Sequence, residues 1–163
     1  MELLDIYDEN KVKTGRIHER GKPMKKGDYT LVVHLWIIND KGDILIQKRQ
    51  SSKKIYPNMW DASVAGAAMK GDDSKSAIIR ETKEELGIDL DMTKSELLFS
   101  FKRDWWFDDI WVAKQNINIK DLNLQYEEVS DAKWVSYNVI ETMVGKGEFI
   151  KYDYMKKLED RIK

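Results

Sequence analysis

The stretch 66–88 reads GAAMKGDDSKSAIIRETKEELGI and decides the fold. Asp72, Asp73 or Ser74 can begin a helix here, because short polar side chains accept hydrogen bonds from the free N–H groups of a first turn. No helix breaker follows until Gly87, which stands where a C-terminal glycine closes a helix. The sequence therefore predicts a helix between this cap and Gly87.

The predicted helix carries an acidic edge. At about 100° per residue, Glu81, Glu84 and Glu85 share one face. Ile78 and Leu86 lie beside that face, so the acids border the buried stripe of the helix. Three crowded carboxylates repel one another. Hard divalent cations such as Mg²⁺ or Mn²⁺ relieve that repulsion, because they bind carboxylate oxygens. A solvated charged surface is the alternative, and these acids alone favour it.

Composition limits the classes of protein that the chain can represent. Its 163 residues suit one domain, 1–163. The 28 basic and 29 acidic residues nearly cancel, so no nucleic acid polymer is expected as a partner. The absence of cysteine excludes disulfides, thiolate metal sites and cysteine nucleophiles. No apolar run is long enough for a membrane span and the first residues lack a signal peptide, so we expect a cytoplasmic protein without membrane contact.

The remaining chain alternates apolar segments with polar turns, which is typical of strands. The expected elements are a hairpin over about 3–19, two paired strands over 29–38 and 43–49, a short strand over 60–65 leading into Gly66, paired strands over 96–103 and 104–115, and a last strand over 133–136. A mixed sheet covered by helices follows from this order.

Two further helices are expected near the C-terminus. Ser136 can cap a helix over 137–144, which the glycines at 145 and 147 would end. A final helix over about 148–162 is predicted from apolar residues at spacings near three, which would form one buried stripe. These residues are Phe149, Tyr152, Met155 and Leu158.

The spacing within 66–88 resembles the box of the Nudix hydrolase family. That box has a glycine, five residues, a glutamate, seven residues, then Arg-Glu, an apolar residue, any residue, Glu-Glu, any residue, Gly and an apolar residue. The matching positions are Gly66, Arg80, Glu81, Glu84, Glu85, Gly87 and Ile88. Two positions depart from the pattern, since Asp72 replaces the first glutamate and Thr82 replaces an apolar residue.

The resemblance implies an α/β fold, namely an α/β/α sandwich with a mixed sheet between helices, and Mg²⁺-dependent hydrolysis of a diphosphate. Glu81, Glu84 and Glu85 would bind the metal with the backbone carbonyl of Gly66, and one carboxylate would act as the base. Arg80 would orient a box glutamate. A further catalytic glutamate is expected in the loop before the last strand, where Glu128 is the first candidate.

Glu127 is the rival of Glu128, and an exposed loop acid without a role is an equal alternative for both. The wider layout of the chain also resembles the Nudix subgroup related to isopentenyl diphosphate isomerase. That enzyme uses a cysteine just before the box, whereas the segment 60–66 here is WDASVAG. Isomerisation therefore ranks below hydrolysis. A nucleotide-sensing module without turnover is a second rival, which the intact glutamates disfavour.

The substrate expected is a small molecule, namely a nucleoside diphosphate or a nucleoside diphosphate linked to another moiety. Arg49, Lys53 and Lys54 could hold its phosphates, although a solvated loop explains them equally well. Aromatic residues could stack on a base, but general burial trends favour a core or dimer-interface role for them. These residues are Trp105, Trp106, Phe107 and Trp111. A homodimer is a further open expectation, and neither His18 nor His34 receives a role.

Overall fold

The computed structural model describes residues 1–162. A main sheet of seven strands has the order β5-β4-β3-β8-β7, with β6 beside β3 and β9 beside β4. Its strands are β3 (Thr30–Ile38), β4 (Ile44–Arg49), β5 (Trp60–Asp61), β6 (Val64–Ala67), β7 (Ser95–Lys102), β8 (Trp106–Lys114) and β9 (Val129–Val135). Since β3 and β8 are parallel whereas β3–β6, β4–β9 and β7–β8 are antiparallel, the sheet is mixed, as predicted.

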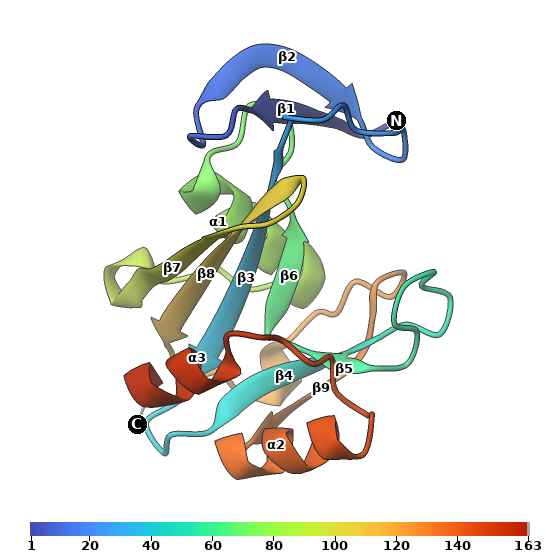
Figure 1. The fold of residues 1–163 in the computed structure, drawn as a ribbon. Helices are drawn as coiled ribbons and strands as arrows, with labels where there is room; N and C mark the ends of the chain where they lie inside the picture. The colour runs from blue at the N-terminus through green and yellow to red at the C-terminus, as the bar shows by residue number, and fades with distance from the viewer. Residues whose placement is uncertain (163) are drawn as a thin grey trace.

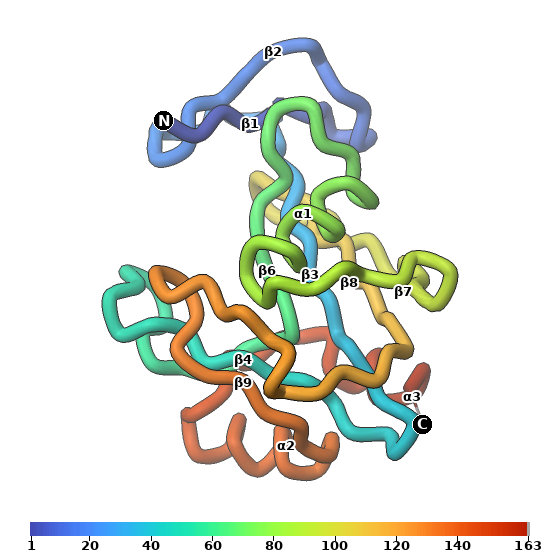
Figure 2. Tube along the Cα trace, turned by 180° about the vertical axis from the view of Figure 1, so that it is seen from behind, coloured from blue at the N-terminus to red at the C-terminus, as the bar shows by residue number. Residues whose placement is uncertain are grey.

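Helices cover both faces of this sheet. Helix α1 (Ser74–Leu86) lies behind β3 and β6 in Figure 1 and in front of them in Figure 2, whereas α3 (Met155–Ile162) lies on the opposite side. Alternate residues of β3 point to the two faces, so Leu35 packs in the cluster beside α1 and Trp36 packs beside α3. Helix α2 (Tyr137–Gly145) also packs in the second cluster. The predicted α/β/α sandwich is confirmed.

The ends of α1 follow the local signals in the sequence. The side chain of Asp73 accepts a hydrogen bond from the N–H of Ser76 at 2.7 Å, and the Ser76 hydroxyl accepts one from the N–H of Asp73 at 2.9 Å. Gly87 ends the helix with φ 71°, a left-handed conformation that glycine adopts without steric cost. Asp73 is therefore the cap among the three expected residues.

Replacing Asp73 by alanine is expected to lower the free energy of unfolding by about 1 kcal/mol, because an N-terminal N–H of α1 loses its acceptor. The bond from Ser76 lowers the pKa of Asp73 below its ordinary value of 3.8. The ionic part of this stabilisation is present above pH 3.8 and is lost as the pH falls through the lowered pKa. Urea unfolding at several pH values measures both effects. Asp73→Asn, which keeps a capping oxygen, should stay close to wild type near neutral pH, and equal losses in both variants would contradict the capping role.

The predicted pairing of the strands over 29–38 and 43–49 is confirmed over a short stretch, and the strand predicted over 60–65 needs correction. Strands β3 and β4 pair only at Ile37–Ile38 with Ile44–Leu45, because β6 occupies the same edge of β3 earlier along the strand. The single strand expected over 60–65 is two strands, β5 on β4 and β6 on β3. Between them, the hydroxyl of Ser63 accepts the N–H of Ile37 at 2.8 Å. Gly66 consequently lies within β6 and not in a turn after it.

The prediction of a helix over 148–162 is wrong for 148–154. The N–H of Trp60 donates to the carbonyl of Glu148 at 2.9 Å, and the N–H of Ile150 donates to the carbonyl of Trp60 at 3.0 Å. These bonds hold residues 148–150 beside β5, and residues 153–154 form a turn before α3 begins. Phe149 still reaches the core, where it stacks on Trp36, so the apolar stripe predicted the burial correctly and the backbone incorrectly.

Strands β1 (Leu3–Tyr7) and β2 (Lys13–Glu19) form the expected hairpin, which lies across one end of the main sheet (Figure 1). A bridge between Tyr7 and Tyr29 joins the hairpin to the chain just before β3. At the hairpin turn, Lys11 forms an ion pair with the buried carboxylate of Asp109 at 2.6 Å. In residues 1–162 no helix combines the length and the apolar character that crossing a membrane requires.

Candidate active site

A cavity of about 720 Å³ opens beside the acidic edge of α1. Its walls come from the ends of the hairpin, β3, β4, β6, α1, the loop 50–59 and residues 150–152 of the segment before α3. The structure places six of the predicted site residues in its lining. These are Gly66, Arg80, Glu81, Glu84, Glu85 and Glu128.

Gly66 and Glu81 are fitted to one another across β6 and α1. A Cβ atom placed on Gly66 would lie 2.4 Å from the carboxyl carbon of Glu81 and within 2.7 Å of both carboxyl oxygens. A side chain at this position would displace the carboxyl of Glu81, so glycine lets that carboxyl approach the backbone of β6. Burial also raises the pKa of Glu81. The requirement for glycine at this position of the box therefore has a steric cause.

Glu85 is the most buried of the three helix acids, with 6% of its surface exposed. The side-chain amide of Gln47 donates a hydrogen bond to its carboxylate at 2.6 Å. Burial and the neighbouring Glu81 raise the pKa of Glu85 well above its ordinary value. Because the charged form of this carboxyl is disfavoured, a cation bound beside it would stabilise that form strongly.

Arg80 connects the acids of the site. Its guanidinium group donates to Asp72 at 2.7 Å, to Glu81 at 3.0 Å and to Glu84 at 3.2 Å, and it also reaches the carbonyl of Ala67 at 3.2 Å. Asp72 accepts the N–H of Met69 as well, at 2.9 Å. The aspartate at the variant box position therefore anchors Arg80 beside Glu81 and Glu84.

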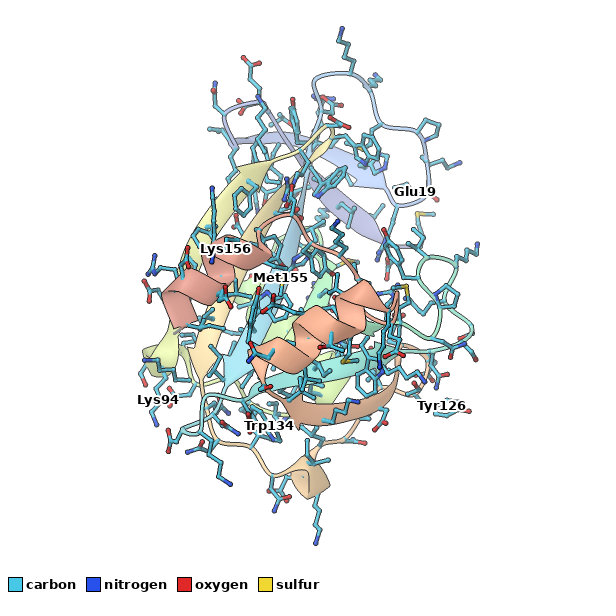
Figure 3. All side chains as sticks on the ribbon, turned by 60° about the horizontal axis from the view of Figure 1, so that its bottom comes forward. Glu19, Lys94, Tyr126, Trp134, Met155 and Lys156 are labelled. Atoms are coloured by element: carbon cyan, nitrogen blue, oxygen red, sulfur yellow. The ribbon has the colours of Figure 1, made fainter. Side chains whose placement is uncertain are left out.

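Glu128 lies in the loop before β9 and lines the cavity, where it forms an ion pair with Lys53. The N–H of Gln50 donates to the carbonyl of Glu128 at 3.0 Å, so the loops 50–59 and 122–128 lie side by side, as Figures 1 and 2 show. Glu127 is exposed and lies outside the lining. Its neighbour Tyr126 is 79% exposed and projects outward in Figure 3. Of the two acids, Glu128 is thus the one at the cavity.

Several polar residues without a predicted role also lie in or beside the cavity. His34 is buried, its Nδ1 lies 2.7 Å from the hydroxyl of Tyr154, and burial lowers its pKa. Asp61 is 2% exposed and accepts the hydroxyl of Tyr152 at 2.5 Å. Gln47 also belongs to this group. Their contacts join segments far apart in the chain, so no local pattern identifies them.

The four aromatic residues considered for base stacking do not line the cavity. Phe107 and Trp111 are buried in the cluster beside α1, and the indole N–H of Trp111 donates to the hydroxyl of Ser74 at 3.0 Å. Trp105 lies in the turn between β7 and β8, and Trp106 is the first residue of β8. The core role that burial trends favoured is correct for Phe107 and Trp111.

The donor set of the site fits a hard divalent cation. Glu81, Glu84, Glu85 and the carbonyl of Gly66 offer oxygen ligands only, and such ligands suit Mg²⁺ or Mn²⁺. Among residues 1–162 no group of three acidic or imidazole side chains is already arranged around a metal position. Arg80 instead shares its guanidinium group between Glu81 and Glu84. These contacts use one oxygen of each carboxylate, Oε1 of Glu81 and Oε2 of Glu84.

Comparison with known proteins identifies the family. The chain matches the NUDIX domain over residues 28–158. It is 43% identical over 158 residues to an uncharacterised Nudix hydrolase of Listeria monocytogenes, with 97% of this chain and 94% of the relative covered. A crystal structure from Deinococcus radiodurans has the same fold, with a TM-score of 0.80, 24% identity and 98% of each chain covered.

The chain belongs to the Nudix hydrolase family and is an enzyme of that family. Nudix hydrolases generally use divalent metals such as Mg²⁺. An isopentenyl-diphosphate Δ-isomerase of Salmonella heidelberg is also similar, at 25% identity over 143 residues, with 83% of this chain and 77% of the relative covered. In this chain the residue before Gly66 is Ala65, which lines the cavity without a thiol.

Proposed function

We propose that this enzyme hydrolyses the diphosphate bond of a nucleoside diphosphate, or of a nucleoside diphosphate linked to another moiety, in a reaction that depends on Mg²⁺. The observation that carries the proposal is the meeting of the box carboxylates and several cationic side chains in one cavity. The cationic residues are Arg20, Arg49, Lys53, Lys70 and Lys151. Carboxylates hold the metal, and the cations bind the phosphates.

The roles follow from the position of each group. Glu81, Glu84, Glu85 and the carbonyl of Gly66 would hold Mg²⁺. A cation held there supplies Lewis acidity toward water and neutralises charge on the phosphoryl oxygens. Water adds to one phosphorus, the bridging P–O bond breaks, and a carboxylate of the site accepts the proton released. Arg80 limits the freedom of the carboxylates and is therefore a positioning residue.

Glu128 and Lys53 act at the other side of the cavity. Their ion pair keeps the carboxylate of Glu128 at the cavity and holds the ammonium of Lys53 beside it. When a diphosphate enters, its oxygens compete with Glu128 for Lys53. Glu128 is then free to bind metal or to accept a proton, which are the two uses that its position supports.

The test is a panel of nucleoside diphosphates and nucleoside diphosphate sugars incubated with Mg²⁺, in which released phosphate or nucleoside monophosphate is measured. We expect turnover of at least one compound and its loss when EDTA removes the metal. Isopentenyl diphosphate belongs in the same panel. Conversion to the dimethylallyl isomer, without hydrolysis of any nucleotide, would replace the hydrolase with the isomerase.

A further inference from the structure

The loop 50–59 presents two large apolar side chains at the cavity. Ile55 is 66% exposed and Tyr56 is 51% exposed, and both belong to the lining. Apolar surface left in water is unfavourable. Where such surface borders a pocket that also holds charged groups, it is typical of a contact with a ligand.

The backbone of this loop adopts a conformation that few non-glycine residues share. Tyr56 has φ 52° and Asn58 has φ 61°, both in the left-handed region, where a side chain carries an energetic cost. The guanidinium Nε of Arg49 donates to the carbonyl of Ile55 at 3.1 Å, and the N–H of Met59 donates to the carbonyl of Tyr56 at 3.4 Å. The loop backbone is thus held on both sides of Tyr56, so little freedom is lost when a ligand contacts the ring.

The same loop contributes cations to the cavity. Arg49 precedes it, and Lys53 lies within it shortly before Tyr56. A diphosphate bound by these cations therefore lies near the ring of Tyr56. The group attached to the diphosphate then has an aromatic surface within reach.

Other aromatic rings of the cavity are already in contact with one another. The ring centroids of His34 and Tyr152 are 4.8 Å apart, and Tyr152 stacks on Tyr154 at 5.2 Å. Tyr152 also donates its hydroxyl to Asp61. Tyr56 differs from these residues, because half of its surface stays open.

We propose that Tyr56 stacks on the base of a nucleoside diphosphate bound in the cavity and makes binding depend on that base. This inference rests on the function proposed above and adds a specificity-determining residue to it. An aromatic face accepts any base by stacking, so Tyr56 distinguishes substrates with a base from those without one.

The test compares two ligands that differ by the nucleoside and resist hydrolysis at the bridge. These are α,β-methylene-ADP and methylenediphosphonate, each titrated calorimetrically with Mg²⁺ present. We expect Tyr56→Ala to weaken binding of α,β-methylene-ADP roughly 10-fold, the scale seen when a stacking aromatic is removed. Binding of methylenediphosphonate should be unchanged. Tyr56→Phe, which keeps the ring, should bind both ligands as wild type does.

Trp105→Ala is the matched control, because Trp105 is 52% exposed and lies outside the cavity lining. It should leave both affinities unchanged. The inference is overturned if Tyr56→Ala weakens both ligands equally, which would mean damage to the loop, or if it weakens neither. It is also overturned, with the hydrolase function intact, if wild type binds both ligands equally. If wild type binds neither ligand, the diphosphate site itself fails and this inference fails with it.

Discussion

Replacing Glu85 by glutamine is expected to lower kcat by about two to four orders of magnitude on any substrate that the enzyme hydrolyses. Glutamine keeps the size of the side chain and can still pair with Gln47, but it removes the negative charge that a cation needs. Steady-state kinetics at saturating Mg²⁺ measure the effect. The loss should be greater than that of most surface changes, because Glu85 lies almost fully buried beside Glu81.

Thermal unfolding separates a lost metal site from a damaged fold. Wild type should gain stability as Mg²⁺ is added, since a ligand that binds only the native state raises the melting temperature. Glu85→Gln should unfold at a temperature similar to that of metal-free wild type and respond much less to Mg²⁺. Glu127→Gln is the matched control and should behave as wild type, because Glu127 is exposed outside the cavity. A variant Glu85→Gln with near-normal kcat would remove Glu85 from the proposed metal set.

Replacing Gly66 by alanine is expected to abolish detectable turnover. The new Cβ atom would lie 2.4 Å from the carboxyl carbon of Glu81, a distance that forces Glu81 or strand β6 to move. Core overpacking costs about 1–3 kcal/mol of stability, and the cost here should lie at the low end of that range, because the atoms met are the end of the Glu81 side chain, which can turn away. The cost is steric and not conformational, because Gly66 does not have a positive φ and alanine can adopt its backbone conformation. Kinetics and urea unfolding of the purified variant measure both losses.

A double-mutant cycle tests whether the loss of stability in Gly66→Ala comes from the contact with the carboxyl of Glu81. In a Glu81→Ala background the carboxyl is missing, so Gly66→Ala should cost little further stability. Gly145→Ala is the matched control, since a Cβ atom there meets nothing within 4 Å. If Gly66→Ala is equally destabilising with and without Glu81, the glycine is needed for another reason.

Local chemistry explains why α1 could be predicted and why the segment 148–154 could not. Asp73 and Gly87, the residues that directly flank α1, determine both of its ends through local contacts. By contrast, Phe149 and Tyr152 have a spacing that suits a helix, but the backbone on either side of Phe149, at Glu148 and Ile150, hydrogen-bonds to Trp60, a residue far away in the chain. The periodicity of apolar residues indicates which side chains are buried. Whether the backbone is helical or extended depends here on its hydrogen-bond partner, the distant residue Trp60.

Some residues of the site could likewise be predicted from local sequence, whereas others depend on contacts between distant segments. The acids on α1 share a face because of helical geometry, so a wheel drawn from the sequence places Glu81, Glu84 and Glu85 correctly. The pairing of Glu128 with Lys53 and the packing of His34 against Tyr154 depend on how distant segments meet. Tyr56 could not be predicted for a different reason. For a tyrosine in a polar loop, no sequence pattern distinguishes a ligand contact from simple exposure to solvent.

The parallel pairing of β3 with β8 has a consequence for how the chain acquires its activity. Helix α1 lies in the connection between these two strands, so its acids are ordered against the sheet only after distant segments have met. Contacts between residues far apart in the sequence form slowly, because the chain loses the entropy of the long loop between them before the contacts contribute any stabilisation. The segment 148–154 completes the cavity wall later still along the chain. In a nascent chain the residues of α1 therefore emerge well before the cavity can be enclosed, and catalytic competence should be among the last properties to appear during refolding.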